Sequence, residues 1–412
     1  MRFRHRDGSL VHLAYCTNVH PAETLADIVA QFDRYAVPVR ERLGVPVLGL
    51  GLWLARDAAR ELAARPERTA WLAAQLRRRG LEVVTLNAFP YAGFHQPRVK
   101  KAVYLPDWTD RRRLDYTLDC ARVLAGLLPD DVAYGSVSTL PLGWRDPWTA
   151  GRQAAALALL DELAEGLAAL HRELGRTVRV GLEPEPGCVV ETTGQAALAW
   201  NGLDHRWLGV CLDTCHLAVQ FEEPQAALGT LAGAGLPVVK AQLSRALRVD
   251  RPDLDTVREA LGRYAEPRFL HQTRTRAPDG TVRGTDDLAG ALDGALDREG
   301  PWRVHFHIPL HADPAPPLHA TGPTLTGALD ALVGGERARV RHLEVETYTW
   351  TVLPAGEQPA GPDGLAAGIA AELAWAADAL VAAGLEDLND RGPRGTRHHS
   401  GPTAARPQES RA

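Results

Sequence analysis

The sequence predicts an α/β protein built on one (β/α)8 barrel. Three observations favour this fold. The chain has 412 residues, enough for one large barrel with additions. Its balance of 45% hydrophobic and 24% charged residues is typical of a globular protein. Short apolar runs alternate with longer stretches of helical spacing, which is the order expected of βαβ units and a parallel sheet.

The predicted strands are short runs rich in Val, Leu and aromatic residues. They cover 10–16, 45–54, 81–89, 132–140, 178–186, 208–216, 237–244, 302–311 and 342–350. The clearest predicted helices lie between them or after them, over 57–79, 150–174 and 366–383.

The nine predicted strands are one more than the eight of a barrel, and the additional strand lies within residues 245–311. Two short runs, 268–276 and 281–285, flank the turn sequence Pro-Asp-Gly and predict a late β-hairpin insertion. We therefore expect the run 302–311 to pair with the hairpin instead of the barrel. The expected organisation is one barrel domain over 1–388.

Two further segments differ from barrel units. Residues 90–115 are long for a loop between strand and helix, and they include Phe94, Lys100 and Tyr104, so we expect them to fold over a site. Residues 389–412 are polar and rich in Gly, Pro and Arg, which predicts a disordered tail.

Composition excludes several classes of protein. A net charge of -5 does not favour a nucleic-acid partner, and no apolar stretch predicts a membrane span. Five scattered cysteines without a CxxC motif indicate reduced thiols, hence a cytoplasmic protein. The sequence lacks a P-loop, a GxGxxG fingerprint after the first strand and a GxSxG elbow, which argues against nucleotide-dependent kinases, Rossmann dehydrogenases and α/β-hydrolases.

Strand alternation predicts which side chains point into the barrel. Glu183, Asp213 and Glu346 fall on the inward phase at the ends of three strands, where barrel active sites are built. Carboxylates buried together need a cation or a proton, so a divalent metal is one interpretation. The alternative is a hydrogen-bonded polar layer with Arg or Lys partners.

Other inward or neighbouring groups are candidates for the same site. Glu185 and Glu344 each lie two residues from a stronger candidate and could act as a base or orient a ligand. Lys240 and Gln242 share the inward phase of the seventh strand. Asn18, His20 and Asn87 follow or end early strands and are candidates for the floor or rim.

The unit Asp213-Thr214-Cys215-His216 is the most specific local feature. Its strand ends on an acid, and His216 can turn back into the same mouth or cap the loop. Cys211 and Cys215 have no second cysteine pair, so we interpret them as structural thiols.

Two histidine groups leave several interpretations open. His305 and His307, with His311 further on, could bind a metal, line a phosphate or sugar pocket, or lie on an exposed hairpin. His271, with Arg274 and Arg276, offers either a cationic cluster for an anionic substrate or a solvated hairpin face.

Three strand-end segments resemble a known superfamily. VGLEPEPG, GVCLDTCH and HLEVETYTW are similar to the fifth, sixth and eighth strands of the xylose-isomerase-like TIM barrels, which include sugar-phosphate isomerases, epimerases and the endonuclease IV type of DNA-repair enzyme. The overall pattern, with NVHP near the start and YLPDW in the third loop, is similar to the EboE proteins. These are described as metabolite traffic proteins of the Ebo gene cluster.

The resemblance implies a set of site residues. Glu183, Asp213 and Glu346 match the metal-binding acids, and His216 matches the histidine of the DxxH motif. Gln242 stands where the superfamily usually has a histidine and could ligate through its carbonyl oxygen. Glu183, Glu346 and His216 are the implied catalytic residues. The remaining candidates are expected to bind substrate: His271, His305, His307, Lys240, Glu185 and Glu344.

The expected function is that of an Ebo-type metabolite traffic protein. It would be a sugar-isomerase-like barrel that binds Mn, Mg or Zn and acts on or handles a small polar metabolite, with other Ebo-cluster proteins as partners. A binding protein with little turnover is the alternative. A metal-dependent phosphodiesterase is disfavoured, because the early strands offer no histidines that match the three-zinc cluster of endonuclease IV.

Overall fold

Eight parallel strands close into a barrel in the computed structural model, which describes residues 1–389. The strands pair in chain order, and the last pairs with the first to complete the ring. This confirms the predicted (β/α)8 barrel. The strands are β2 (Leu10–Cys16), β3 (Leu48–Trp53), β4 (Leu81–Asn87), β5 (Gly135–Thr139), β6 (Val178–Leu182), β7 (Leu208–Asp213), β8 (Val238–Leu243) and β14 (His342–Val345).

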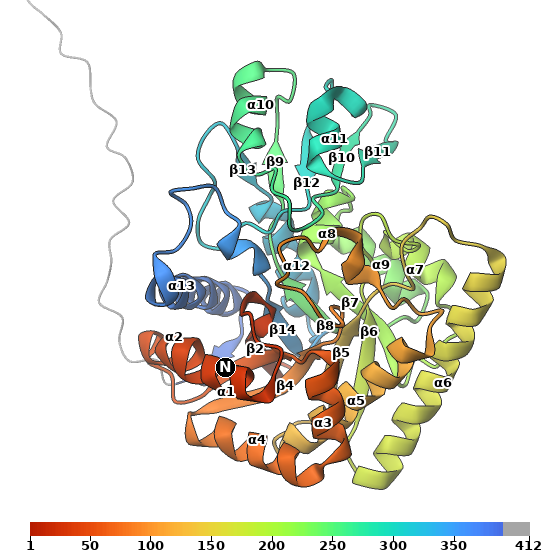
Figure 1. Cartoon of the computed structure of the whole chain (residues 1–412), viewed down its shortest axis with the longest axis vertical. Coiled ribbons are helices and arrows are strands. Elements are labelled where there is room, and N and C mark those ends of the chain that lie inside the picture. Colours follow the sequence, from red (N-terminus) through yellow and green to blue (C-terminus); the bar gives the residue numbers. More distant parts are fainter. Residues whose placement is uncertain (390–412) are drawn as a thin grey trace, which may run out of the picture.

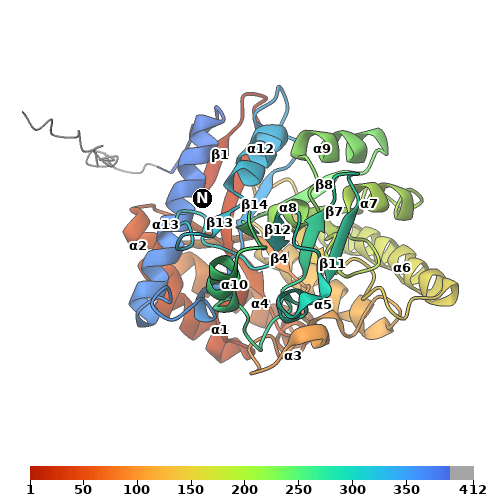
Figure 2. The same cartoon turned by 90° about the horizontal axis from the view of Figure 1, so that it is seen from above.

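Helices surround this barrel on the outside (Figures 1 and 2). Their apolar faces pack on the outward Val and Leu side chains of the strands, so each strand is buried on both faces, as parallel sheets require. The helices are α1 (Leu25–Gln31), α2 (Val37–Leu43), α3 (Arg56–Ala64), α4 (Pro66–Arg78), α5 (Arg111–Leu127), α6 (Ala150–Leu174), α7 (Thr193–Ala199), α8 (Thr214–Val219), α9 (Pro224–Gly233), α12 (Gly322–Val333) and α13 (Gly361–Ala382).

A second sheet of five strands lies between β8 and β14 in the chain. Its order is β11-β10-β12-β9-β13, and all its pairings are antiparallel. The elements of this lobe are β9 (Leu247–Val249), α10 (Asp255–Gly262), β10 (Thr273–Arg276), β11 (Val282–Thr285), α11 (Leu288–Gly290), β12 (Trp302–Val304) and β13 (His319–Ala320).

The lobe contains the predicted hairpin. β10 and β11 pair with Thr273 opposite Thr285, and Gly280 turns with a φ of +88°. Of the predicted run 302–311, only β12 is a strand, and it pairs with β10 and β9 instead of the barrel. The pairing with the hairpin is therefore confirmed. The sheet also takes in β13, which lies beyond the predicted limit at residue 311.

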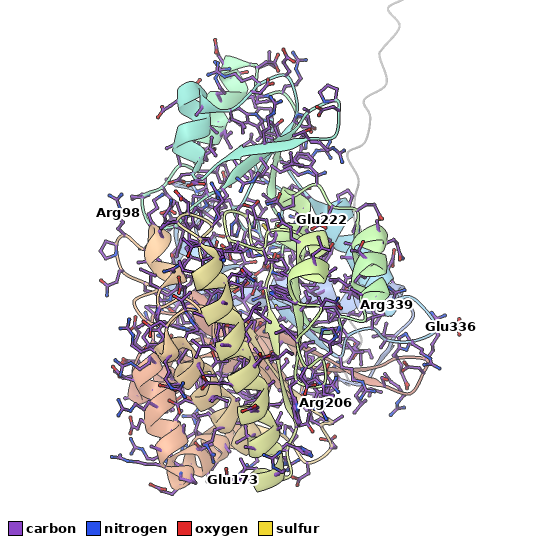
Figure 3. All side chains as sticks on the ribbon, turned by 90° about the vertical axis from the view of Figure 1, so that its right-hand side faces the viewer. Arg98, Glu173, Arg206, Glu222, Glu336 and Arg339 are labelled. Atoms are coloured by element: carbon purple, nitrogen blue, oxygen red, sulfur yellow. The ribbon has the colours of Figure 1, made fainter. Side chains whose placement is uncertain are left out.

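The lobe stands over the C-terminal ends of the barrel strands. Figure 3 shows Glu173, at the end of α6, on the side of the barrel away from the lobe. Arg206 precedes β7 and lies low in that view, whereas Glu222 follows α8, the helix after β7, and lies nearer the lobe. The strands therefore run toward the lobe, and their ends face it.

The inward phase of the strands is unusually polar. The Oγ of Ser136 donates to Thr85, and the Nδ1 of His342 lies 2.8 Å from the Oγ of Ser136. One layer nearer the lobe, Lys240 and Glu344 form an ion pair and are both fully buried. The predicted inward positions of Lys240 and Glu344 are confirmed.

The two ends of the described chain meet at the far side of the barrel. β1 (Arg2–Arg4) pairs with both β2 and β15 (Glu386–Asp387). Asn389 is buried and bonds both backbone groups of Arg2, although the predicted tail begins at this residue. The rest of that predicted tail, 390–412, lies outside the described residues.

Helix α13 and the cysteines bear on two earlier expectations, the lack of a membrane span and the reduced state of the thiols. By length and composition α13 could cross a membrane, but it lies in the outer ring of the barrel, and half of its apolar window is buried there. The five cysteines are buried, and none forms a disulfide, which agrees with the expectation of reduced thiols.

Candidate functional site

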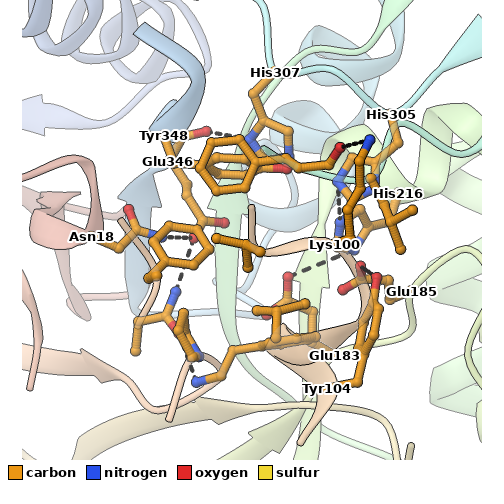
Figure 4. A pocket seen from close by; sticks show the side chains of 18 residues that line it. Asn18, Lys100, Tyr104, Glu183, Glu185, His216, His305, His307, Glu346 and Tyr348 are labelled. Atoms are coloured by element: carbon orange, nitrogen blue, oxygen red, sulfur yellow. Dashed lines mark hydrogen bonds and ion pairs between the residues drawn. The ribbon is translucent and has the colours of Figure 1, made fainter. Parts of the chain in front are cut away.

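A cavity lies at the C-terminal mouth of the barrel (Figure 4). Barrel strand ends form its floor. The segment that follows β4 forms one wall, including the 3-10 helix η3 (Lys100–Tyr104), and the lobe contributes Phe269 and Leu270. The loop 90–115 was expected to fold over a site, and Phe94, Lys100 and Tyr104 do line this cavity.

Glu183, Asp213 and Glu346 come together at the floor. Each offers a carboxylate oxygen, and the three oxygens lie within 4.8 Å of one another. All three side chains are buried. Among residues 1–389, no lysine or arginine forms an ion pair with any of them; the only such partner is His216, whose Nδ1 lies 3.6 Å from Glu183. The prediction placed these acids side by side from strand phase alone.

The two oxygens of Asp213 have different surroundings. Oδ1 accepts the backbone N–H groups of Cys215 and His216 and the hydroxyl of Ser244, at 2.7, 3.0 and 2.7 Å. Asp213 thereby caps the N-terminus of α8. Oδ2 is buried and has no hydrogen-bond partner among residues 1–389. The cap fixes the carboxylate and leaves one oxygen free.

Glu346 is oriented by two amides from distant strands. Its Oε1 accepts Asn18 Nδ2 at 2.7 Å and Asn87 Nδ2 at 2.9 Å. Asn18 follows β2, and its carbonyl is bonded to His95 at 2.8 Å. Asn18 and Asn87, predicted as floor or rim groups, thus hold one oxygen of Glu346, whose side chain lines the cavity.

The acids are costly to ionise together. Burial raises the pKa of Glu183 well above its ordinary value, and the charges of Glu346 and Asp213 add to this. Burial likewise raises the pKa of Glu346, with Asp213 and Glu344 adding to it. Without a compensating cation, burial and mutual repulsion therefore favour the protonated form of Glu183 or Glu346.

His307 offers an imidazole lone pair to the same place. Its Nδ1 lies 2.6 Å from the carbonyl oxygen of Glu346, which can only accept, so Nδ1 carries the proton. Nε2 then holds the lone pair, and it is buried without a hydrogen-bond partner in the residues that the structure describes. Ligand atoms of His307, Asp213 and His216 lie within 4.8 Å of one another. A backbone carbonyl that fixes the tautomer in this way is typical of metal-binding histidines.

His216 and His305 face each other across the join between barrel and lobe. Their Nε2 atoms lie 3.1 Å apart. His216 Nδ1 is 3.0 Å from the carbonyl of Pro184, and His305 Nδ1 is 2.8 Å from Gln272 Oε1. Because Nδ1 donates in both rings, two neutral rings would point lone pairs at each other. The contact therefore requires a proton or a cation between the Nε2 atoms.

Glu185 occupies the edge of the same site. Its carboxylate accepts the hydroxyl of Tyr104 at 2.6 Å, and Gln272 donates to the same Tyr104 oxygen at 2.9 Å. Burial raises the pKa of both Glu185 and Tyr104. A second group with metal-ligand spacing is formed here by Glu185, His216 and His305.

The structure does not bring every predicted site residue to the cavity. Lys240 and Glu344 pair with each other beneath the floor. His271 bonds Glu266 and the carbonyl of His305, each at 2.8 Å, and so joins two segments within the lobe. Its neighbours Arg274 and Arg276 form no common cationic pocket there, since Arg274 bonds Thr285 O and Arg276 covers a ring of Phe221.

Gln242 lies fully buried beside the acids. Its Oε1 accepts the thiol of Cys211 at 3.3 Å, and its Nε2 has no partner. A role as an oxygen ligand would require the amide to turn over. His307, for which the sequence left both metal binding and substrate binding open, presents its lone pair without such a change.

The barrel and its acid site define a class of protein, and comparison with known families identifies it. The sequence model of the family described as the xylose isomerase-like TIM barrel matches residues 39–262, more than half of the chain. The chain belongs to this family. No curated protein matches it.

Several solved structures are similar over nearly the whole chain. An L-ribulose 3-epimerase is 12% identical, with a TM-score of 0.50, covering 90% of this chain and 95% of its own. A xylose isomerase domain protein from Alicyclobacillus acidocaldarius is 18% identical, with a TM-score of 0.45 and coverage of 90% and 99%. The IolI protein, solved with a zinc atom, is 12% identical, with a TM-score of 0.47 and coverage of 90% and 98%. At these identities the likeness concerns the fold.

Proposed function

We propose that this protein is a metal-dependent isomerase or epimerase that acts on a small metabolite with adjacent carbonyl and hydroxyl groups. One observation carries the proposal: three buried carboxylates meet at the barrel mouth with no lysine or arginine partner among residues 1–389. The alternative of a polar layer paired with cations is weakened because Lys240 is already bonded to Glu344.

The residues present fit a divalent cation. Glu183 Oε2, Asp213 Oδ2 and His307 Nε2 are all buried atoms without hydrogen-bond partners in the described part of the chain. Such atoms are costly in a folded protein unless something binds them. Glu183, Asp213 and Glu346 would hold the ion, with His307 supplying the imidazole that the seventh strand lacks. Carboxylates with one imidazole suit Mn or Zn, and Mg if water completes the set.

A bound cation would polarise a carbonyl oxygen and stabilise negative charge beside it. The protein must then move a proton at the neighbouring carbon. Glu346 suits a base, because two amides fix one of its oxygens and its side chain lines the cavity. Glu183 lines the same cavity and can serve as its partner. His216 lies beside Glu183 and can relay a proton toward His305.

We also propose a narrower assignment, to the EboE-type metabolite traffic proteins. The similarity to the EboE proteins rests on NVHP and YLPDW, whose residues Asn18 and Tyr104 hold acids of the site. A role in metabolite traffic in the cytoplasm, with Ebo-cluster partners, would be compatible with a barrel that binds its ligand and turns it over slowly.

Metal analysis of the purified protein tests the proposal. One or two equivalents of Mn, Mg or Zn, removed by chelator and restored with a rise in melting temperature, would support it. Three equivalents of zinc would favour a phosphodiesterase. A protein that takes up no metal and binds its ligand equally in chelator would be a binding protein, and the proposal would be wrong.

A further inference from the structure

We infer that the ligand of this cavity is uncharged and has two unlike ends: an oxygen-bearing head at the acids and an apolar, ring-sized body against the opposite wall. The inference rests on the proposed function for the head and on the walls of the cavity for the body. It argues against a sugar phosphate and against a ligand that carries hydroxyls on every side.

The wall opposite the acids is mainly apolar. Phe94, Val99 and Phe269 form a small buried cluster with Trp53, separate from the barrel core, and Val103 packs on it. The rings of Phe94 and Phe269 are 5.1 Å apart. Phe89 and Leu270 continue this surface within the cavity.

This wall has few groups that could satisfy ligand hydroxyls. The hydroxyl of Tyr104 reaches it, but that hydroxyl already donates to Glu185 and accepts from Gln272. A hydroxyl placed against Phe94 or Phe269 would lose its water without gaining a partner, which disfavours binding. A hydrocarbon group placed there would gain from burial.

The cavity also lacks a free cation for a phosphate group. Lys100 is the only lysine or arginine that lines it in the described chain. Its Nζ donates to the carbonyls of Glu266 and Phe269, at 3.3 and 2.7 Å, and to Asp287 at 2.6 Å. An ammonium has three protons, so Lys100 has none left for a ligand. Its charge is also paired with Asp287.

One side chain connects the two ends of the cavity. The ring of Tyr348 lies 4.7 Å from the ring of His307, on the acid side. It also lies 5.5 Å from Phe94 and 4.9 Å from Phe269, on the apolar side. A single small molecule whose head lies at the acids must therefore place its body against these rings.

A matched pair of probes tests the inference. Acetohydroxamate and benzohydroxamate share a metal-binding head and differ by a methyl against a phenyl group. Calorimetric titration of the Mn-loaded full-length protein should show benzohydroxamate binding at least about tenfold more tightly. Glucose 6-phosphate should not displace it at equal concentration.

Two variants locate the preference. Phe269→Ala, and the isosteric Val103→Thr, should each reduce the preference for benzohydroxamate several-fold and leave acetohydroxamate binding unchanged. Val103→Thr keeps the shape of the wall, so it remains informative if Phe269→Ala folds poorly. Leu198→Ala, at a side chain that is 85% exposed, is the matched control and should change neither affinity.

The outcomes separate this inference from the proposed function. Equal affinity for the two probes, or displacement by glucose 6-phosphate, would overturn the apolar-body inference while leaving a metal site in place. A protein that takes up no Mn and binds neither probe would refute the proposed function and with it this inference.

Discussion

Lys240 and Glu344 form an ion pair inside the barrel, one layer beneath the acid site, and neither side chain is exposed. Burial alone would lower the pKa of Lys240, but the Glu344 carboxylate raises it above its ordinary value, so the ammonium stays charged. The charge of Lys240 is thus used within this pair, and among residues 1–389 Glu183, Asp213 and Glu346 have no lysine or arginine partner.

Breaking this pair should destabilise the barrel. Lys240→Met leaves the Glu344 carboxylate buried without its partner, and we expect a loss of roughly 3–5 kcal/mol in the free energy of unfolding, measured by urea denaturation. The double variant Lys240→Met/Glu344→Gln removes both charges and should recover much of this loss. A single variant that costs under about 1 kcal/mol would contradict a buried, charged pair.

Removing an amide that orients Glu346 should lower the affinity for metal more than it lowers the free energy of unfolding. In Asn18→Ala, Glu346 keeps only the hydrogen bond from Asn87, so its carboxylate is less well positioned. We expect the affinity for Mn or Zn to fall about 10- to 100-fold by calorimetric titration. Asn201→Ala, at an exposed asparagine, is the control and should bind metal normally. Unchanged affinity in Asn18→Ala would mean that Glu346 is not a ligand.

A buried histidine outside the acid site should make stability depend on pH. Burial lowers the pKa of His20 to about 3 in the folded protein, where the ring stacks on Tyr35 at 4.2 Å. The unfolded chain takes up this proton near pH 6.5, so His20 reduces stability as the pH falls.

His20→Gln isolates this effect from that of the acids. Between pH 7 and pH 5, the unfolding free energy of the wild type should fall by about 2 kcal/mol relative to the variant. Urea denaturation of both metal-free proteins at the two pH values measures it. A constant difference would show that His20 is protonated in the fold or is accessible to water.

The sequence was sufficient to predict the acid cluster. Val and Leu on the outward phase of β6, β7 and β14 mean that Glu183, Asp213 and Glu346 point into the barrel. Barrel closure then brings these strand ends together. The excess strand and the hairpin were also predictable, because turn chemistry and strand count are local properties of the chain.

The contribution of the lobe could not be predicted in the same way. His305 and His307 follow β12 in residues outside any strand, so alternation does not apply to their final placement. Their positions depend on how the second sheet docks on the barrel, through contacts such as His307 Nδ1 with the carbonyl of Glu346. The apolar wall likewise joins Phe94 and Phe269, which are far apart in the sequence.

The thermal melting of Asp213→Asn, with and without Mn or Zn, tests the central claim most directly. The variant keeps Oδ1 as the cap of α8 and removes the charge that repels Glu183 and Glu346. At a metal concentration one hundred times Kd, the wild type should gain about 2.7 kcal/mol. The account predicts a metal-free variant at least as stable as the metal-free wild type, and little gain with metal. A variant that melts lower than the wild type by the same amount with and without metal would contradict the account and indicate a structural acid.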